Sequence, residues 1–146
     1  MRFALSVFCL LSLLASCQRL EKNAEPAPRL ENNRWMLVQV EETPVPTPSY
    51  SLSARSYLEF ASADHKTSGL APCNTYGGTY TLGSTQGTLT ISGQMSTRGT
   101  CPAQALEYRY LSGLTQTVRY EITGDELRLY GPDNSLQPKL TFNLAR

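Results

Sequence analysis

The chain has 146 residues, of which 40% are hydrophobic and 17% charged, a composition typical of one folded domain with short tails. Arg2 is the only charged residue before Cys17, so the chain from Cys17 onward carries 12 basic against 12 acidic side chains. This balance, without a cluster of Lys and Arg, excludes nucleic-acid binding, because that class must neutralise several phosphates at once.

Residues 1–16 have the layout of a secretory signal. Met1 and Arg2 give a positive start, residues 3–14 form an almost uninterrupted apolar run, and the small residues Ala15 and Ser16 follow. The alternative is a transmembrane helix, which needs about 20 apolar residues, whereas this run has 12. We therefore expect residues 1–16 to be an export signal that is removed.

Cys17 is the predicted site of lipidation. The sequence LASC at residues 14–17 resembles the bacterial lipobox, in which the thiol is joined to diacylglycerol and cleavage makes the Cys the new amino terminus. Several acyl chains, palmitate among them, give lasting membrane attachment at about 0.8 kcal/mol per buried methylene group. An Asp after the lipidated Cys resembles an inner-membrane retention signal, so Gln18 favours the outer membrane, facing the periplasm. We predict a lipid-anchored protein of the cell envelope.

Residues 17–33 are predicted to form a flexible tether. They are polar, contain Pro26 and Pro28, and show no hydrophobic period. The folded domain is therefore expected to span residues 34–146.

Cys73 and Cys101 are the predicted disulfide. Cys9 leaves with the signal and Cys17 takes the lipid, so these two remain as partners in an oxidising compartment. Closing a loop of about 29 residues stabilises a fold by roughly 3.6 kcal/mol. The wide spacing favours a static bond over a redox pair.

His65 is the only histidine and no Cys-x-x-Cys is present, so we predict no metal and no cofactor.

The first half of the domain alternates apolar and polar residues, which is typical of strands. Residues 35–40 form a predicted strand with both faces covered, and residues 57–61 form a second. Between them, residues 41–50 carry three prolines and are predicted to be a surface loop. The polar residues 62–69, SADHKTSG, suggest a hairpin connection.

The middle of the domain is predicted to contain two further strands and one helix. Residues 79–82 alternate, residues 83–87 form a turn, and Leu89 and Ile91 have strand spacing. After Cys101, Pro102 suits the first turn of a helix. The segment to residue 116 places one apolar stripe at helical spacing: Ala103, Leu106, Tyr110, Leu111 and Leu114.

The last third is predicted to be a hairpin and a final strand. Residues 118–122 and 127–129 alternate on either side of a Thr-Gly-Asp turn, and residues 140–142 follow a turn at 131–135. Seven or eight strands with one helix indicate a mainly β, β-rich α+β fold. We expect an antiparallel sheet curled into a small barrel, which leaves few open edges, with the amphipathic helix packed on it.

Residues 69–80, GLAPCNTYGGTY, resemble the signature of the META domain, also called the HslJ-like domain. The similarity extends over residues 30–144, with further matching positions at Trp35, 58–60, Thr97, Cys101, Glu107, 120–127 and 140–142. Pro72 and the pair Gly99-Thr100 depart from the usual pattern, which affects the backbone around the disulfide. No cysteine is lost.

The resemblance implies a bacterial envelope lipoprotein linked to heat or other stress, in a family without a generally assigned activity. It marks Cys73, Asn74, Gly78, Tyr80, Thr97 and Cys101 as the most specific positions, and none of them has a catalytic pattern. Asn74 is expected to bond to backbone in a tight turn. Gly78 is expected where a side chain would clash.

The sequence is compatible with three functional hypotheses. The first is a non-enzymatic envelope module that binds a protein or envelope component in stress tolerance. The second is a lipocalin-like carrier of a small apolar ligand, because the eight tyrosines of a small barrel either fill its interior or line a cavity. The third is a hydrolase using His65, which is disfavoured because Asp64 and His65 are adjacent and cannot easily face each other as orienter and base. We therefore predict that the protein is not an enzyme.

Overall fold

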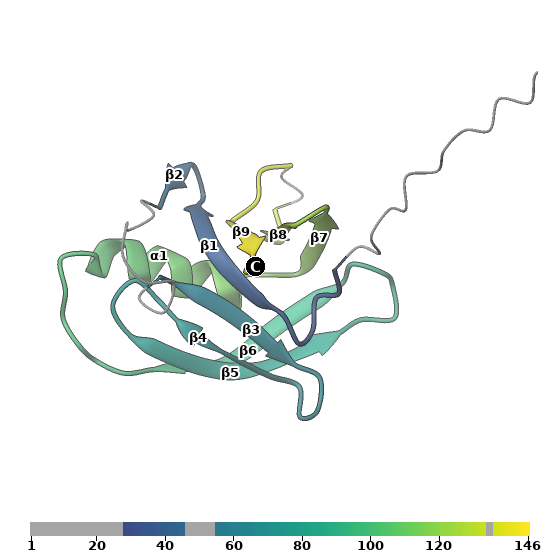
Figure 1. Cartoon of the computed structure of the whole chain (residues 1–146), viewed down its shortest axis with the longest axis horizontal. Helices are drawn as coiled ribbons and strands as arrows, with labels where there is room; N and C mark the ends of the chain where they lie inside the picture. The colour runs from purple at the N-terminus through teal and green to yellow at the C-terminus, as the bar shows by residue number, and fades with distance from the viewer. Residues whose placement is uncertain (1–27, 46–54, 134–135) are drawn as a thin grey trace, which may run out of the picture.

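The computed structural model describes residues 28–45, 55–133 and 136–146 (Figure 1). The predicted export signal, Cys17 and the tether up to residue 27 lie outside the described residues. So do most of the proline-rich loop, at residues 46–54, and part of the last turn, at residues 134 and 135.

Nine strands and one helix make up the described fold. Their bounds are β1 Arg34–Val40, β2 Thr43–Pro44, β3 Tyr57–Ala61, β4 Lys66–Leu70, β5 Thr75–Leu82, β6 Leu89–Ser96, α1 Gln104–Thr115, β7 Arg119–Thr123, β8 Glu126–Tyr130 and β9 Leu140–Leu144. The strands form one antiparallel sheet in the order β6-β5-β4-β3-β1-β9-β8-β7, and β2 pairs with β1 alone. The predicted fold class, mainly β with one helix, is confirmed.

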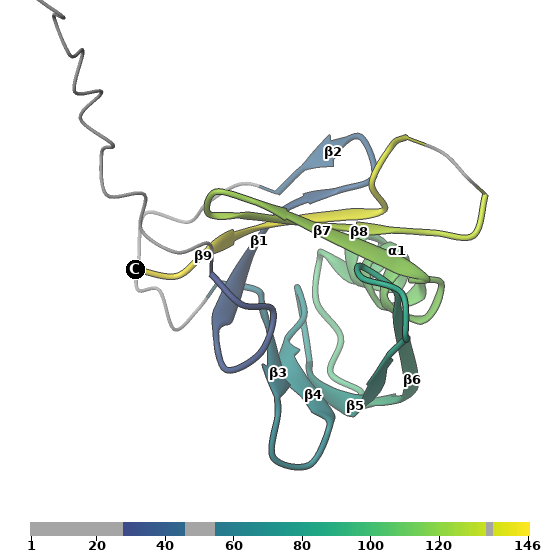
Figure 2. The ribbon, with the colours of Figure 1, turned by 90° about the vertical axis from the view of Figure 1, so that its right-hand side faces the viewer.

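The sheet curls until its two edge strands meet at one end. The Leu89 N–H donates to the Val118 carbonyl at 3.1 Å, and the Tyr120 N–H donates to the Gly87 carbonyl at 2.7 Å. Register shifts in β1 and β5 mark irregularities where strands commonly bend. Figure 2 shows β1, β9, β8 and β7 as one layer over β3 to β6, with α1 between the diverging edges. The result is a half-barrel that the helix covers on its open side.

The interior of the half-barrel is filled by side chains. Fully buried aromatic and aliphatic residues from every part of the fold meet there, among them Trp35, Phe60, Tyr110, Phe142, Leu58, Leu89, Ile91, Leu114, Leu127, Leu129 and Leu140. Interdigitated packing of this kind is that of an ordinary protein core. The sequence left open whether the interior is filled or hollow, and the structure shows it filled.

Strand β4 was not predicted. Its inward positions are Thr67 and Gly69, both buried, so the alternation that signals a strand carries no large apolar residue. Gly69 is required there because a Cβ would lie 2.1 Å from the Tyr57 carbonyl oxygen. The predicted hairpin connection at residues 62–69 is therefore shorter, and its second half is a core strand.

The domain begins before the predicted boundary at residue 34. Residues 30–33, assigned to the tether from sequence, pack onto the barrel. Leu30 is 4% exposed, its carbonyl accepts from Trp35 Nε1 at 2.9 Å, and the Asn32 N–H donates to the Phe60 carbonyl at 2.8 Å. A polar segment without a hydrophobic period can still pack on the domain when one of its apolar side chains is buried in the core.

Candidate functional site

Glu107, on the first turn of α1, is a buried carboxylate held by three donors. Its Oε2 accepts from the backbone N–H groups of Cys73 at 2.7 Å and Asn74 at 2.8 Å. Its Oε1 accepts from Asn74 Nδ2 at 2.7 Å. A buried charge is tolerated when such donors replace water. The carboxylate therefore fixes the start of α1 against the turn between β4 and β5.

Asn74 extends this network to the loop between β6 and α1. Its Oδ1 accepts from Thr97 Oγ1 at 2.9 Å and from the Gly99 N–H at 2.6 Å. Its Nδ2 also donates to the Gly99 carbonyl at 2.9 Å. Asn74 thus makes the expected backbone contacts, but with a loop 25 residues away instead of its own turn.

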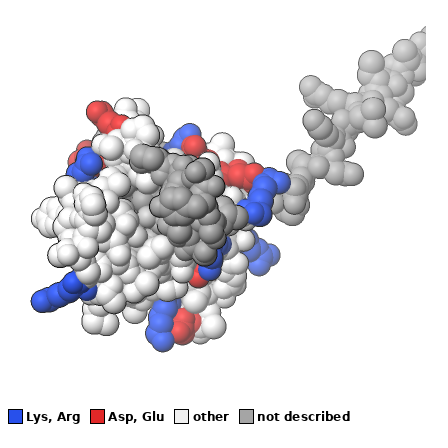
Figure 3. All heavy atoms as spheres, turned by 60° about the vertical axis from the view of Figure 1, so that its left-hand side comes forward, with Lys and Arg blue, Asp and Glu red and all other residues white. Residues whose placement is uncertain are grey.

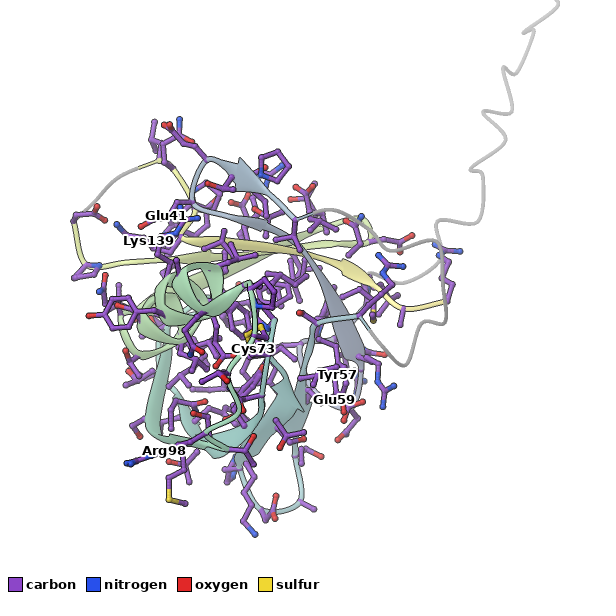
Figure 4. All side chains as sticks on the ribbon, turned by 90° about the vertical axis from the view of Figure 1, so that its left-hand side faces the viewer. Glu41, Tyr57, Glu59, Cys73, Arg98 and Lys139 are labelled. Atoms are coloured by element: carbon purple, nitrogen blue, oxygen red, sulfur yellow. A yellow bond between two sulfur atoms is a disulfide. The ribbon has the colours of Figure 1, made fainter. Side chains whose placement is uncertain are left out.

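The predicted disulfide between Cys73 and Cys101 is present, with Cα atoms 5.8 Å apart. It joins the same turn to the loop that precedes α1, beside the helix start (Figure 4). The Ala103 N–H donates to Cys101 Sγ at 3.2 Å. We call this group of five residues the clamp: Cys73, Asn74, Thr97, Cys101 and Glu107.

Four of the six family-specific positions lie in the clamp, and the other two serve β5. A Cβ on Gly78 would lie 2.0 Å from Gln94 Nε2 and 2.6 Å from the Ser92 carbonyl oxygen, so only glycine fits. Tyr80 is 3% exposed; its hydroxyl donates to the Glu31 carboxylate and lies 3.2 Å from the Ala61 carbonyl oxygen. All six positions therefore hold the fold together.

Sequence reasoning did not assign Glu107 to the site. The helical period contained the signal, because position 107 lies four residues after Ala103 and three before Tyr110, on the same stripe. A carboxylate within an apolar stripe points inward and needs donors there. The buried stripe observed in α1 is Glu107, Tyr110, Gly113 and Leu114.

Two buried tyrosines form a second polar contact inside the barrel. The hydroxyls of Tyr76 and Tyr110 lie 2.5 Å apart, and Tyr76 also donates to the Tyr57 carbonyl at 3.0 Å. Burial, and then the neighbouring Tyr110 phenol, hold the pKa of Tyr76 well above its ordinary value of 10.0. Burial likewise raises the pKa of Tyr110. Both phenols are neutral hydrogen-bonding groups of the core.

His65 lies in the exposed turn between β3 and β4, with a positive φ of 54°. Its ring contacts the edge of Tyr80 at 5.5 Å between centroids. The Asp64 carboxylate binds Lys66 Nζ at 2.9 Å, and this hydrogen bond lowers the pKa of Asp64. Within the described ranges, no group of three or more His, Cys, Asp and Glu residues is placed to hold a metal ion.

A groove of about 290 Å³ runs between β6 and α1. Met95 and Tyr108 stand at its sides, 78% and 76% exposed. We call this the β6–α1 groove, and seven residues line it: Gln94, Met95, Ser96, Tyr108, Leu111, Ser112 and Thr115. None of the seven is charged.

A larger groove, of about 610 Å³, lies between residues 28–31, the turn at residues 86 and 87, and β7. Its rim mixes Arg29 and Arg119 with Glu31 and Glu121. Figure 3 shows Lys and Arg scattered among Asp and Glu over one face of the molecule. Neither this groove nor this face presents charge of a single sign, so neither suits a strongly charged partner.

Among the helices of the described ranges, none has the length and apolar character needed to cross a membrane.

Comparison with known proteins identifies the fold. The family model of the META domain matches residues 28–141. An NMR structure of a protein from Burkholderia xenovorans is similar, with 26% sequence identity over 80% of this chain and 83% of that chain and a TM-score of 0.60. A crystal structure of a DUF4847 family protein from Bacteroides vulgatus covers 80% of this chain and 93% of its own at 16% identity and a TM-score of 0.52, which shows the shared fold alone. A comparison with curated proteins finds no match.

Proposed function

This chain belongs to the META domain family, and from that premise we propose that it is a non-enzymatic binding module, tethered by lipid at Cys17 in the bacterial cell envelope. Its partner is a protein or another envelope component, in the context of stress tolerance. Membership of this family supports a location in the cell envelope. The signal-like residues 1–16 and the lipobox-like LASC support export and attachment of lipid.

The observation that carries the proposal is the use of the family-specific residues. Cys73, Asn74, Thr97 and Cys101 form a disulfide and a hydrogen-bond network that fix two loops and a helix start. A disulfide at the centre of the motif suits an exported protein, because thiols stay reduced in the cytosol. Residues that hold surface loops rigid support binding, since a preordered surface loses less entropy on association.

The two alternatives gain less support. A carrier of a small apolar ligand needs a cavity, and the barrel interior is packed with side chains. The groove between residues 28–31 and β7 has Arg and Glu side chains in its lining, which do not suit an apolar ligand. A hydrolase centred on His65 needs a carboxylate to orient the imidazole, and the Asp64 carboxylate is engaged by Lys66.

The lipid anchor is tested by labelling cells with tagged palmitate. Wild type is expected to carry the label in the outer-membrane fraction, and Cys17→Ala to lose it. Cys9→Ala is the matched control, because its residue leaves with the signal and labelling should persist. Gln18→Asp is expected to move the labelled protein to the inner membrane. An unlabelled wild-type protein that keeps residues 1–16 would contradict the proposal.

A further inference from the structure

We propose that the β6–α1 groove binds an extended, uncharged peptide segment of a partner protein, and that the segment donates a hydrogen bond to the side chain of Gln94. This rests on the proposed function and deepens it, since it assigns the binding surface and the chemistry of the partner. The groove has two apolar walls, one buried polar group and a rigid frame.

The walls of the groove expose large apolar side chains. Met95 on β6 is 78% exposed and Tyr108 on α1 is 76% exposed. Leu111, also on α1, is partly buried and lines the groove. Two large exposed side chains beside one groove offer apolar contact area to a partner. Met and Tyr are also the residue types enriched in interfaces, because they adapt to a partner while offering large contact area.

Gln94 provides an acceptor that lacks a donor. Its Nε2 donates to Thr67 Oγ1 at 2.9 Å, whereas its Oε1 is buried and is the one such side-chain atom without a hydrogen-bond partner in the described ranges. A buried acceptor left unpaired is costly and calls for an explanation. The terminal torsion of Gln is soft, so the carboxamide can turn toward a donor that enters the groove.

Gly78, one of the family-specific positions, lies directly beside the Gln94 carboxamide. The Gln94 carboxamide occupies the space where a Cβ of residue 78 would stand. The family-specific glycine is thus what allows Gln94 to lie across the sheet.

The chemistry of the lining favours a peptide over other ligands. A phosphate or lipid headgroup needs a cation, and the seven lining residues carry none. An acyl chain has no N–H group to offer Gln94. A peptide supplies both a backbone donor and apolar side chains. β6 is also the last strand in the sheet order, and an extended segment can lie along the part of its edge that does not meet β7.

The clamp fixes the two walls relative to each other. Residues 97–103 connect β6 to α1, and they are held by Asn74 through Thr97 and Gly99 and by the disulfide at Cys101. Glu107 holds the helix start itself. The groove is therefore preordered, and binding does not have to order its walls.

The test selects peptides from a phage-displayed heptapeptide library on the purified chain beginning at Cys17, with disulfide intact. We expect enriched sequences that are uncharged and contain a large apolar residue. Labelled copies of these peptides should bind wild type, and Met95→Asp and Tyr108→Asp should each weaken binding at least tenfold. Gln94→Leu should weaken it about fivefold.

Leu136→Asp is the matched control, because Leu136 is 90% exposed and lies outside the groove. It should bind the peptides as wild type does. Met95 and Tyr108 are exposed, so their variants should give wild-type circular dichroism spectra.

Four results would overturn the proposal: no enrichment, enrichment of charged sequences, binding unaffected by Met95→Asp, or occupation of the groove by a second copy. The last is seen as a dimer in sedimentation that Tyr108→Asp dissociates. A chain that takes up palmitate but selects no peptide overturns the groove assignment alone. One that selects peptides without palmitate overturns the anchor alone.

Discussion

The Glu107 carboxylate accepts a hydrogen bond from the Asn74 side chain at 2.7 Å across 33 residues of sequence. Glu107 is 3% exposed and Asn74 is 4% exposed. Each of them also binds backbone: Glu107 that of the turn after β4, and Asn74 that of the loop after β6. One buried pair therefore joins the turn after β4, the loop after β6 and the start of α1.

Glu107→Ala is expected to lower the free energy of unfolding by about 3 to 5 kcal/mol, because three buried donors lose their acceptor. Glu107→Gln should cost less, about 1 to 3 kcal/mol, since its amide keeps one oxygen but turns its NH₂ toward another donor. Urea unfolding with the disulfide intact measures both. Glu42→Gln, at an exposed position, is the control and should change stability by less than about 0.5 kcal/mol.

Replacing Cys73 and Cys101 by Ala is expected to cost roughly 3.6 kcal/mol on the chain-entropy model. The disulfide and Glu107 hold the same turn, so their effects should not add. We expect the triple variant to lose about 1 kcal/mol less than the sum of the separate losses. Denaturant midpoints and slopes of the variants measure this coupling. Strict additivity would mean that the two contacts hold the turn independently.

Much of the fold could be predicted because most strands place large apolar residues on one face. Leu58 and Phe60 in β3, and Leu127 and Leu129 in β8, alternate as the sheet requires, and all four are buried. β4 was missed because tertiary contacts demand small inward residues there. No local pattern encodes that demand.

The candidate site could be predicted in its cysteines but not in its geometry. The disulfide follows from counting cysteines, whereas the role of Glu107 depends on donors supplied by a distant turn. Gln94 could not be assigned to the inner face of β6 by alternation. The register of β5 and β6 shifts between Gly77 and Thr79, and Gly93 takes a positive φ of 61°, which breaks the period of two.

The Tyr76 and Tyr110 pair predicts a loss of stability in alkaline solution. Burial raises both pKa values above the ordinary 10.0, so the unfolded state releases the two protons first. The stabilising contribution is therefore complete below pH 10 and is lost as the pH rises beyond it. We expect up to about 1.4 kcal/mol per pH unit for each phenol.

The measurement is urea unfolding at several pH values from about 8 to 11.5. The double variant Tyr76→Phe, Tyr110→Phe should be less stable than wild type at pH 8, because Tyr76 loses its bond to the Tyr57 carbonyl. Its stability should nevertheless fall less steeply above pH 10. Equal slopes for the two proteins would show that other groups cause the alkaline loss.

Leu30 decides where the domain begins. Its side chain belongs to the hydrophobic core cluster at 4% exposure, and its carbonyl is the acceptor for the Trp35 indole N–H. Leu30→Ala is expected to cost about 2 to 3 kcal/mol, the usual effect of emptying a core site. Leu136→Ala removes the same atoms at 90% exposure and should leave stability within about 0.5 kcal/mol of wild type.

A chain that starts at residue 34 gives the stronger version of this test. It lacks Leu30, the Asn32 bond to Phe60 and the Glu31 contact with Tyr80, so it should lose more than Leu30→Ala does. Its Trp35 indole N–H would also lose its buried acceptor, which costs about a further 1 to 3 kcal/mol. Trp35 fluorescence during urea unfolding reports both effects. Were residues 17–33 wholly a tether, the shortened chain would unfold at the wild-type urea concentration.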